Sequence, residues 1–396
     1  MTSFARRLYW SKPYKTHFTA KVKGISSDAV ALDQTLFYPA SGGQASDLGF
    51  LRLSGTKAHI SVIAVEKDET GVIWHRMSKN DLTQFKIGVE IEGTIDWDRR
   101  YQLMRSHTSQ HILSAAILQI AGIQTRQAII ETTGIKLVLE EAISDEDLVQ
   151  ALVLSNEIAT SAHPIVSKIL TSKDAKTQLE TLRKQQIPPG EEIRIIEILG
   201  HDKMACGGTH VRETTEVGPM YLLERRPQVL TYVVGRQALE KAAQNNLSYL
   251  ELGNRLNVTT SRIVETIQMR LDTLQLRQEQ RNEAIKAFLS CKTAEKGVHI
   301  GEIVHQPLNL TFSDRKIALR ELGKPHAGEV VSVLIEKGIF LIFSNSKYPA
   351  KDLMAEFCKR TGGKGGGSNS QAQCSVQITN PHQVLEEILR EYESRA

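Results

Sequence analysis

The 396-residue chain has few cysteines and no long uncharged apolar run, and these absences narrow its class first. Its four cysteines are widely separated, which excludes a disulfide framework and favours a reducing cytosol. No window approaches the roughly 18 apolar residues that a membrane-spanning helix needs. The N-terminus also lacks the apolar segment of a secretion signal. We therefore expect a soluble, cytoplasmic protein without a membrane partner.

The composition is ordinary for a globular protein. Hydrophobic residues make up 41% of the chain and charged residues 24%, which excludes wholesale disorder. The formal net charge of +4 is a mild excess that permits a nucleic-acid partner without arguing for one. The length predicts two or three domains with ample core.

Hydrophobic periodicity and turn residues predict an α+β chain. Short apolar runs near the N-terminus indicate closely spaced strands, as in a small barrel. Asp96 or Asp98 can cap a following helix that ends near Gly122. We also expect a strand at 129–139 and a helix at 172–185. The predicted parts are a small β-barrel (1–95), an α+β zinc-binding core (96–232), a helical linker or hairpin (233–290) and a C-terminal α/β domain (291–396).

Two pairs of metal-binding side chains carry the strongest chemical signal. His107 and His111 are four residues apart in the predicted helix, which places both imidazoles on one face. Far downstream, Cys206 and His210 are also four apart, and the two glycines between them allow a tight loop. Either pair alone is commonplace, but together they suit tetrahedral Zn²⁺ better than Mg²⁺ or Ca²⁺. We predict one zinc ion per chain, and the spacing leaves a structural or a catalytic role open.

The segments His107–His111 and Cys206–Val211 resemble the signature of the alanyl-tRNA synthetase editing domain and its free-standing relatives, the AlaX proteins. Phe37–Gly49 resembles the glycine-rich motif of that family. Arg360–Gln373 resembles the glycine-rich segment of the synthetase's C-terminal DHHA1-type domain. The resemblance covers nearly the whole chain, in the order of the long AlaX-L type.

The resemblance implies a trans-editing hydrolase. Its substrate would be tRNA(Ala) misacylated with serine, and possibly with glycine, and zinc would be its cofactor. Residues 96–232 would form the editing (deacylase) core, and residues 291–396 would form a DHHA1-like domain, with a possible homodimer through the C-terminal region. Because the residues ahead of Asp96 read as β-barrel rather than as an aminoacylation domain, we expect no charging of tRNA.

Three polar residues are the candidate catalytic residues, which would recognise the seryl hydroxyl or the ester. Gln127 stands where the family has an active-site glutamine. Thr35 precedes the glycine-rich motif, and Gln44 ends the glycine run inside it. Their plainer interpretations are a solvent-facing glutamine, a strand threonine and a turn residue. We rank Gln127 first, because its amide offers both donors and an acceptor. Gly42 and Gly43 would let the backbone approach the substrate closely.

Two departures from the family pattern keep other functions open. Lys136 stands for the family's arginine as a substrate-binding residue, and Val138 stands where the family has an aspartate. A zinc-fold tRNA-binding or regulatory protein without catalysis is therefore an alternative, as is a deacylase for another misacylated tRNA. No glutamate lies between His107 and His111, so the metalloprotease arrangement is absent and a positioning role for zinc is favoured.

Overall fold

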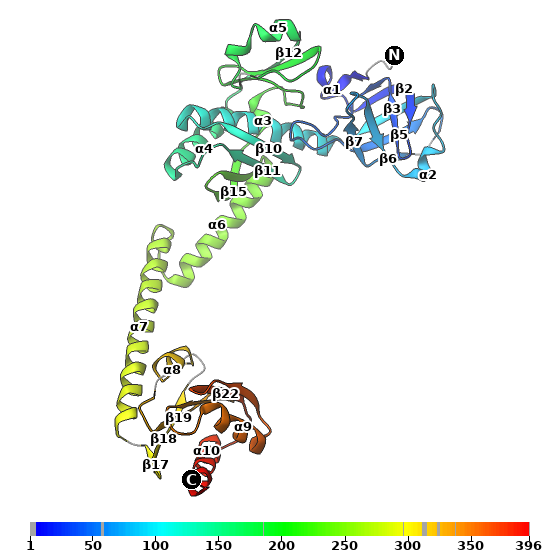
Figure 1. Cartoon of the computed structure of the whole chain (residues 1–396). Coiled ribbons are helices and arrows are strands. Elements are labelled where there is room, and N and C mark those ends of the chain that lie inside the picture. The colour runs from blue at the N-terminus through cyan, green and yellow to red at the C-terminus, as the bar shows by residue number, and fades with distance from the viewer. Residues whose placement is uncertain are drawn as a thin grey trace. The chain divides into compact units, whose positions relative to one another are not determined.

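The computed structural model divides into two compact units, Met1–Glu251 and Leu252–Ala396, and each unit is described by itself (Figure 1). None of the described helices combines the length and apolarity that a bilayer crossing requires. The structure describes residues 5–56, 59–184, 186–295, 297–310, 315–322, 325–336 and 338–395.

A seven-stranded antiparallel sheet forms the N-terminal part of the first unit, in the order β6-β5-β9-β2-β3-β8-β7. Burial alternates along β2, which places every second side chain in the core of the sheet. The strands are β2 (His17–Ile25), β3 (Ala29–Leu32), β5 (Gly49–Leu53), β6 (Ile60–Val62), β7 (Ala64–Lys67), β8 (Ile73–Arg76) and β9 (Glu90–Ile95). The short elements around them are β1 (Arg6–Arg7), α1 (Leu8–Ser11), β4 (Gln34–Thr35) and α2 (Lys79–Leu82).

The expectation of a barrel is wrong in one respect, because this sheet is not closed. Its edge strands β6 and β7 pair with β5 and β8, and the described ladders contain no pairing between the two edges. The two edges are consecutive in the chain and are separated by Ile63 alone. Antiparallel pairing commonly needs a turn of about two or more residues. One kinked stretch of chain therefore supplies both edges without joining them.

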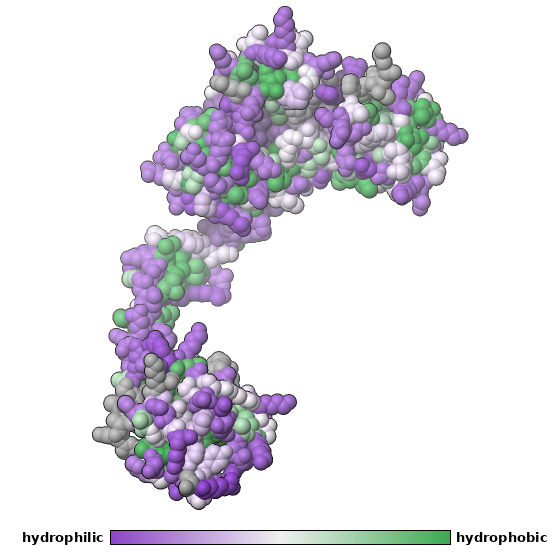
Figure 2. All heavy atoms as spheres, in the orientation of Figure 1, coloured by the Kyte–Doolittle hydropathy of each residue, from purple (hydrophilic) through white to green (hydrophobic). Residues whose placement is uncertain are grey.

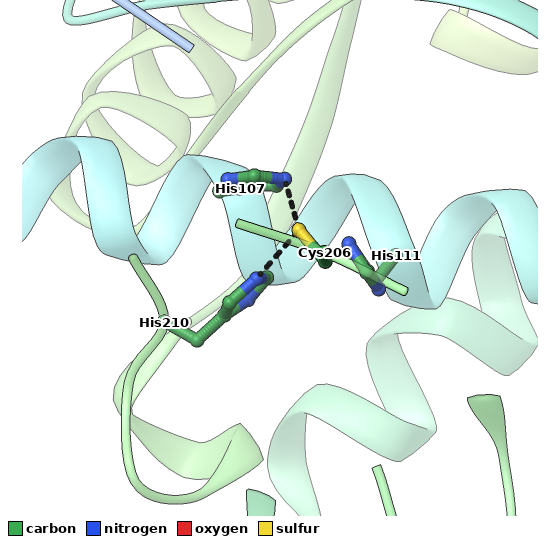
Figure 3. A group of neighbouring side chains, drawn as sticks. All are labelled: His107, His111, Cys206 and His210. Carbon is green, nitrogen blue, oxygen red and sulfur yellow. Dashed lines mark hydrogen bonds between the residues drawn. The ribbon is translucent and has the colours of Figure 1, made fainter. Parts of the chain in front are cut away.

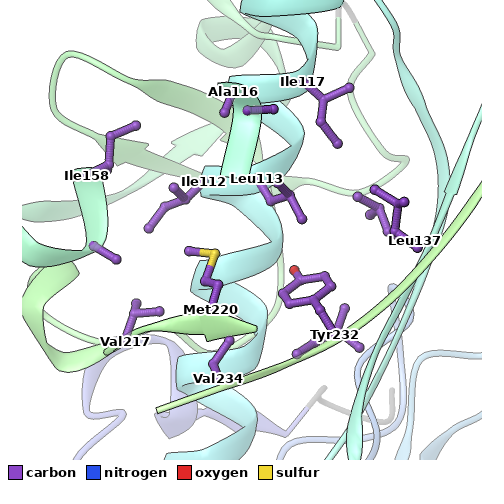
Figure 4. Close-up of a cluster of buried hydrophobic side chains, with 14 of the residues drawn as sticks. Ile112, Leu113, Ala116, Ile117, Leu137, Ile158, Val217, Met220, Tyr232 and Val234 are labelled. Carbon is purple, nitrogen blue, oxygen red and sulfur yellow. The ribbon is translucent and has the colours of Figure 1, made fainter. Parts of the chain in front are cut away.

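A long buried helix, α3 (Trp97–Ala121), organises the next part of the first unit. The Asp96 carboxylate caps it by accepting a hydrogen bond from the Arg99 backbone N–H, and Gly122 ends it in the left-handed conformation, as the sequence predicts. Figure 4 shows its apolar stripe packed among buried side chains of a neighbouring sheet and helix. That sheet has the order β10-β11-β16-β15, and α3 also packs on α4 (Asp145–Thr160).

The strands of this sheet are β10 (Thr125–Glu131), β11 (Gly134–Leu139), β15 (Met220–Arg226) and β16 (Val229–Val234). The single strand predicted at 129–139 is therefore a hairpin, which turns at residues 132–133. The two turn residues are threonines, and the one glycine beside them, Gly134, is a weak turn signal by itself.

A three-stranded sheet, β12-β13-β14, leads into the cysteine loop. Its strands are β12 (Ile165–Thr171), β13 (Glu192–Ile198) and β14 (Asp202–Ala205), and Cys206 follows β14 directly. The helix predicted at 172–185 is shorter: α5 (Ser172–Lys176) is followed by a single 3-10 turn (Leu179–Thr181), and residue 185 lies outside the described residues.

The second unit contains a six-stranded sheet in the order β17-β18-β19-β20-β22-β21. The predicted helical stretch is present as α6 (Arg236–Leu256), most of which lies in the first unit, and α7 (Ile263–Glu295). Apolar side chains of α7 are exposed, and Figure 2 shows green patches along it. The glycine cluster forms the exposed edge strand β21. The remaining elements are β17 (Val298–Ile300), β18 (Ile303–Leu310), α8 (Arg315–Glu321), β19 (Glu329–Ile335), β20 (Ile339–Ser344), α9 (Ala350–Thr361), β21 (Lys364–Gly367), β22 (Gln371–Ser375) and α10 (Pro381–Arg395).

Candidate metal centre

The four predicted ligands meet at one point (Figure 3). His107 and His111 project from the middle of α3, while Cys206 and His210 come from the loop after β14. The ligand atoms of the four side chains lie within 4.8 Å of one another. The three histidines are buried, so the cluster sits inside the protein rather than on a solvated face.

The distances between the ligand atoms fit a tetrahedral metal. The Cys206 Sγ lies 3.4 Å from the Nε2 atoms of both His107 and His210. Zinc bonds of about 2.3 Å to sulfur and 2.0–2.1 Å to nitrogen, at a tetrahedral angle, separate S and N by about 3.6 Å. Three imidazoles and one thiolate can therefore hold one metal ion, and this donor set fits Zn²⁺. Four protein ligands describe a closed site.

Each histidine is also fixed through its outer nitrogen. The Nδ1 of His107 lies 2.7 Å from the Gln44 Oε1, and that of His111 lies 2.8 Å from the Asp202 Oδ2. The Nδ1 of His210 lies 3.1 Å from the hydroxyl of Thr108. Oxygen acceptors at Nδ1 leave Nε2 as the metal-facing nitrogen of every ring, which is the usual support for metal-binding histidines.

Two of these outer partners are themselves held. The Arg183 Nε donates to the Asp202 Oδ1 at 2.7 Å, so the carboxylate is paired on both sides. The Gln44 amide accepts from the Thr209 backbone N–H at 3.0 Å and donates to the Thr209 hydroxyl at 2.9 Å. Asp202 and Thr108 escaped the sequence analysis. The only sequence signal that could have identified Asp202 is its place four positions before a candidate ligand cysteine.

The electrostatics of the cluster favour the metal-binding forms of two ligands. Burial raises the pKa of Cys206, but His107 and His210 overcome this and bring it well below its usual value. Burial, followed by repulsion from His107, lowers the pKa of His210 well below its usual value. Burial also lowers the pKa of His111, yet the bond to Asp202 outweighs it and raises that pKa to about 9. A thiolate and a neutral imidazole are the forms that coordinate metal.

Glycines allow two loops to pack against this centre. A Cβ at Gly208 would lie 2.1 Å from the Cε1 of His107, so only glycine fits beside that ring. A Cβ at Gly43 would lie 2.1 Å from the Ala128 backbone oxygen, where the glycine-rich turn docks on β10. Gly42 and Gly43 have φ values of 57° and 84°, as a tight two-residue hairpin turn requires.

A cavity of about 1240 Å³ opens onto the cluster. His107, His111 and Cys206 are part of its wall, together with the Cys206–Gly208 loop. Cationic side chains outnumber the two acidic ones, which are Glu191 and Glu192. The cationic residues in the wall are Arg6, Arg7, Lys67, Arg126, Arg183, Lys184 and Arg194. The cavity therefore suits an anionic ligand larger than an ordinary metabolite.

The structure places three of the predicted substrate-contacting residues at this cavity: Gln127, Gly42 and Gly43. Thr35 and Gln44 are buried away from its wall. The Thr35 hydroxyl lies 2.8 Å from the His75 Nε2 and accepts from a backbone N–H. The catalytic roles predicted for Gln127, Thr35 and Gln44 stay predictions.

The two departures from the family pattern lie on β11. Lys136 is exposed and does not line the cavity. Val138 is buried and pairs with Gln127 across the β10–β11 ladder. Its apolar side chain therefore lies beside the predicted active-site glutamine, and no carboxylate occupies this position.

Known proteins resemble this chain along nearly its whole length. The profile described as tRNA synthetases class II (A) matches residues 9–99, and that of the threonyl and alanyl tRNA synthetase second additional domain matches residues 193–238. Alanine–tRNA ligases of Methanococcus maripaludis strain S2 and Pyrococcus abyssi are 28% and 29% identical over 97% of this chain and 43% of their own length. The enzyme of Methanococcus maripaludis strain C5 is 30% identical over 96% of this chain.

A solved structure, the C-Ala domain of Aquifex aeolicus alanyl-tRNA synthetase, matches 24% of the chain and 98% of its own length at 23% identity. Its TM-score of 0.22 is too low to carry an argument about the fold.

This chain is thus similar to alanyl-tRNA synthetases over nearly its whole length, and the resemblance seen in the sequence is confirmed. The matched second additional domain contains two of the four candidate metal ligands, Cys206 and His210. The chain spans less than half the length of the curated relatives that it matches.

Proposed function

We propose that this protein is a zinc-dependent, trans-editing deacylase that hydrolyses seryl-tRNA(Ala), and also glycyl-tRNA(Ala). The observation that carries the proposal is the cluster of three histidines and one cysteine in the wall of a cationic cavity. The kinship with alanine–tRNA ligases supports tRNA(Ala) as the RNA partner.

The chemical need for such an enzyme is clear. A synthetase pocket shaped for alanine rejects serine poorly, because an added hydroxyl gives an apolar pocket little to exclude. A second, hydrolytic site can reverse the selection by hydrogen-bonding the hydroxyl. Alanine would leave the buried partner of that bond unpaired, which disfavours it.

The cavity has the size and charge for the 3′ end of an aminoacyl-tRNA. Arg6, Arg7, Lys67, Arg126 and Lys184 lie in its wall and would meet the phosphates of the terminal nucleotides. A cavity of about 1240 Å³ admits an aminoacylated nucleotide rather than a free amino acid alone. RNA binding through these side chains would weaken as the salt concentration rises.

Zinc, when bound, would supply a fixed positive charge beside the cavity and would hold the Cys206–His210 loop against α3. Because His107, His111, Cys206 and His210 complete its coordination, the chain itself must position the reacting groups. Gln127 would bind the ester carbonyl from the rim. The open cavity would admit the attacking water from solvent.

A non-catalytic, tRNA-binding role is the second candidate. The observation that favours it is Val138, whose buried apolar side chain pairs with Gln127 and cannot act as a base. A deacylase for another misacylated tRNA is a third possibility. A homodimer through the C-terminal region is a further proposal, which is compatible with each of these three functions.

The deciding experiment is a deacylation assay of the zinc-loaded full chain with seryl-, glycyl- and alanyl-tRNA(Ala), and with threonyl-tRNA. The proposal requires release of serine from tRNA(Ala) well above the rate without protein, and slower release of alanine. If only threonine is released, the third candidate replaces the proposal. Tight tRNA binding with no release from any substrate would establish the non-catalytic role instead.

A further inference from the structure

A glutamine between the two helix-borne ligands shares their side of α3. His107, Gln110, His111 and Ser114 follow the three-and-four spacing that puts side chains on one helix face. Gln110 is only 8% exposed, and it lines the cavity beside both histidines. In the sequence alone, a polar residue between two candidate ligands looks like ordinary helix surface.

A short hydrogen-bond chain fixes the amide of Gln110. Its Nε2 donates to the Ser114 hydroxyl oxygen at 2.8 Å, and the Thr125 hydroxyl donates to the same oxygen at 2.8 Å. Among the described residues no group donates to the Gln110 Oε1, and that oxygen is not sealed off from solvent. The amide therefore presents an acceptor to the cavity.

Resting on the proposed function, we infer that Gln110 is a specificity-determining residue whose Oε1 accepts the hydrogen bond of the seryl hydroxyl. It is better placed than the residues ranked from the sequence. Thr35 and Gln44 already have protein partners and lie off the cavity wall. Gln127 lines the cavity but is exposed, so water competes for its amide.

Burial is what makes the contact selective. A bound ester would displace water from the Gln110 Oε1. An alanyl ester lacks the hydroxyl and would then leave this acceptor without a partner, and the cost of that unpaired group adds to the lost bond. The α-ammonium group cannot provide this discrimination, because seryl, glycyl and alanyl esters all carry it. A contact to the ammonium would change all three substrates together.

The test compares stable amide-linked analogues, seryl- and alanyl-3′-amino-3′-deoxyadenosine, by calorimetric titration of the zinc-loaded full chain. The variants are Gln110→Met, which keeps the volume but removes the acceptor, and Ser114→Ala, which removes the group that orients it. Gln102→Met is the matched control, because Gln102 also lies on α3 and also pairs with a serine four residues on, at 3.4 Å, but is not part of the cavity wall. Zinc content is measured for every variant.

We expect Gln110→Met to reduce the seryl-to-alanyl affinity ratio about tenfold, and Ser114→Ala to reduce it about threefold, with zinc retained. Gln102→Met should keep the wild-type ratio. A wild-type ratio in both cavity variants, or an equal loss for both analogues, overturns the inference. Should Gln110→Met fail to fold, Ser114→Ala decides alone.

This titration, combined with the deacylation assay of the same protein, separates this inference from the proposed function. A wild-type protein that prefers the seryl analogue through Gln110 but hydrolyses no tRNA would support the contact and refute the deacylase. A wild-type protein that hydrolyses seryl-tRNA(Ala) while Gln110→Met keeps its selectivity would do the reverse. Absence of binding to either analogue would overturn the contact.

Discussion

Replacing Gly208 by alanine should weaken metal binding strongly without replacing any ligand residue. A Cβ at this position would lie 2.1 Å from the Cε1 and 2.2 Å from the Nδ1 of His107, and 2.9 Å from the Gln44 Oε1. Separations below 3 Å force something to move, and here the mobile group is a buried ring held by a 2.7 Å hydrogen bond. The added methyl group therefore displaces a ligand and breaks its outer support together.

The magnitude follows from both effects. Loss of an outer-shell partner typically weakens metal binding 10- to 100-fold. Overpacking a well-packed interior costs about 1–3 kcal/mol more. We expect zinc affinity to fall by at least about 100-fold, which is about 2.7 kcal/mol. Since zinc joins α3 to a distant loop, the zinc-dependent gain in melting temperature should shrink as well.

Zinc affinity is measured by competition with a chromophoric chelator, and the geometry is checked by the visible spectrum of the cobalt-substituted protein. Gly207→Ala is the matched control, because its Cβ would meet nothing closer than Trp10 at 3.9 Å. Gly207→Ala should bind zinc as tightly as the wild type. If Gly208→Ala does so too, the packing described around His107 is wrong.

Three further predictions address neighbouring features. Asp202→Asn should weaken zinc binding about 10- to 100-fold, because the carboxylate orients His111 at 2.8 Å; an unchanged affinity by chelator competition would contradict this. Gly43→Ala should lower the denaturant midpoint far more than Gly42→Ala. Both glycines have positive φ, but only a methyl group at residue 43 would meet backbone, at 2.1 Å. Equal decreases in the midpoint for the two variants would count against the docked turn. Burial lowers the pKa of His75 from 6.5 to about 4. Between these two pH values only the unfolded chain binds the proton, so the free energy of unfolding should fall by up to about 3 kcal/mol as the pH drops from 6.5 to 4. His75→Gln should show a flatter pH profile in urea titrations, and a profile parallel to that of the wild type would refute the assignment.

Local chemistry made the metal centre predictable from the sequence. The spacing of His107 and His111 needs only a helix, and that helix has an aspartate cap and a glycine end, which the structure confirms. Cys206 and His210 needed only a glycine-bearing loop. Their convergence with the helix pair is a long-range contact, which the matching donor types of the two pairs indicated and the resemblance to a known family supported.

Features that depend on contacts between distant segments escaped prediction. Whether the N-terminal strands close into a barrel depends on the pairing of β6 with β7, which no local pattern encodes. Two of these features are contacts between elements: Asp202 pairs with His111, and Thr108 pairs with His210. A third is Gln110, which faces the cavity. Gly208 reads as a flexible loop residue until the ring of His107 is seen against it.

The measurement that tests the central claim most directly is single-turnover release of serine from seryl-tRNA(Ala), with zinc content determined on the same samples. The account predicts one zinc per chain and rapid release for the wild-type protein. It predicts loss of both for the His107→Ala, His111→Ala double variant, because these residues supply two of the four ligands. Stoichiometric zinc retained by the double variant, or undiminished serine release without zinc, would contradict the account.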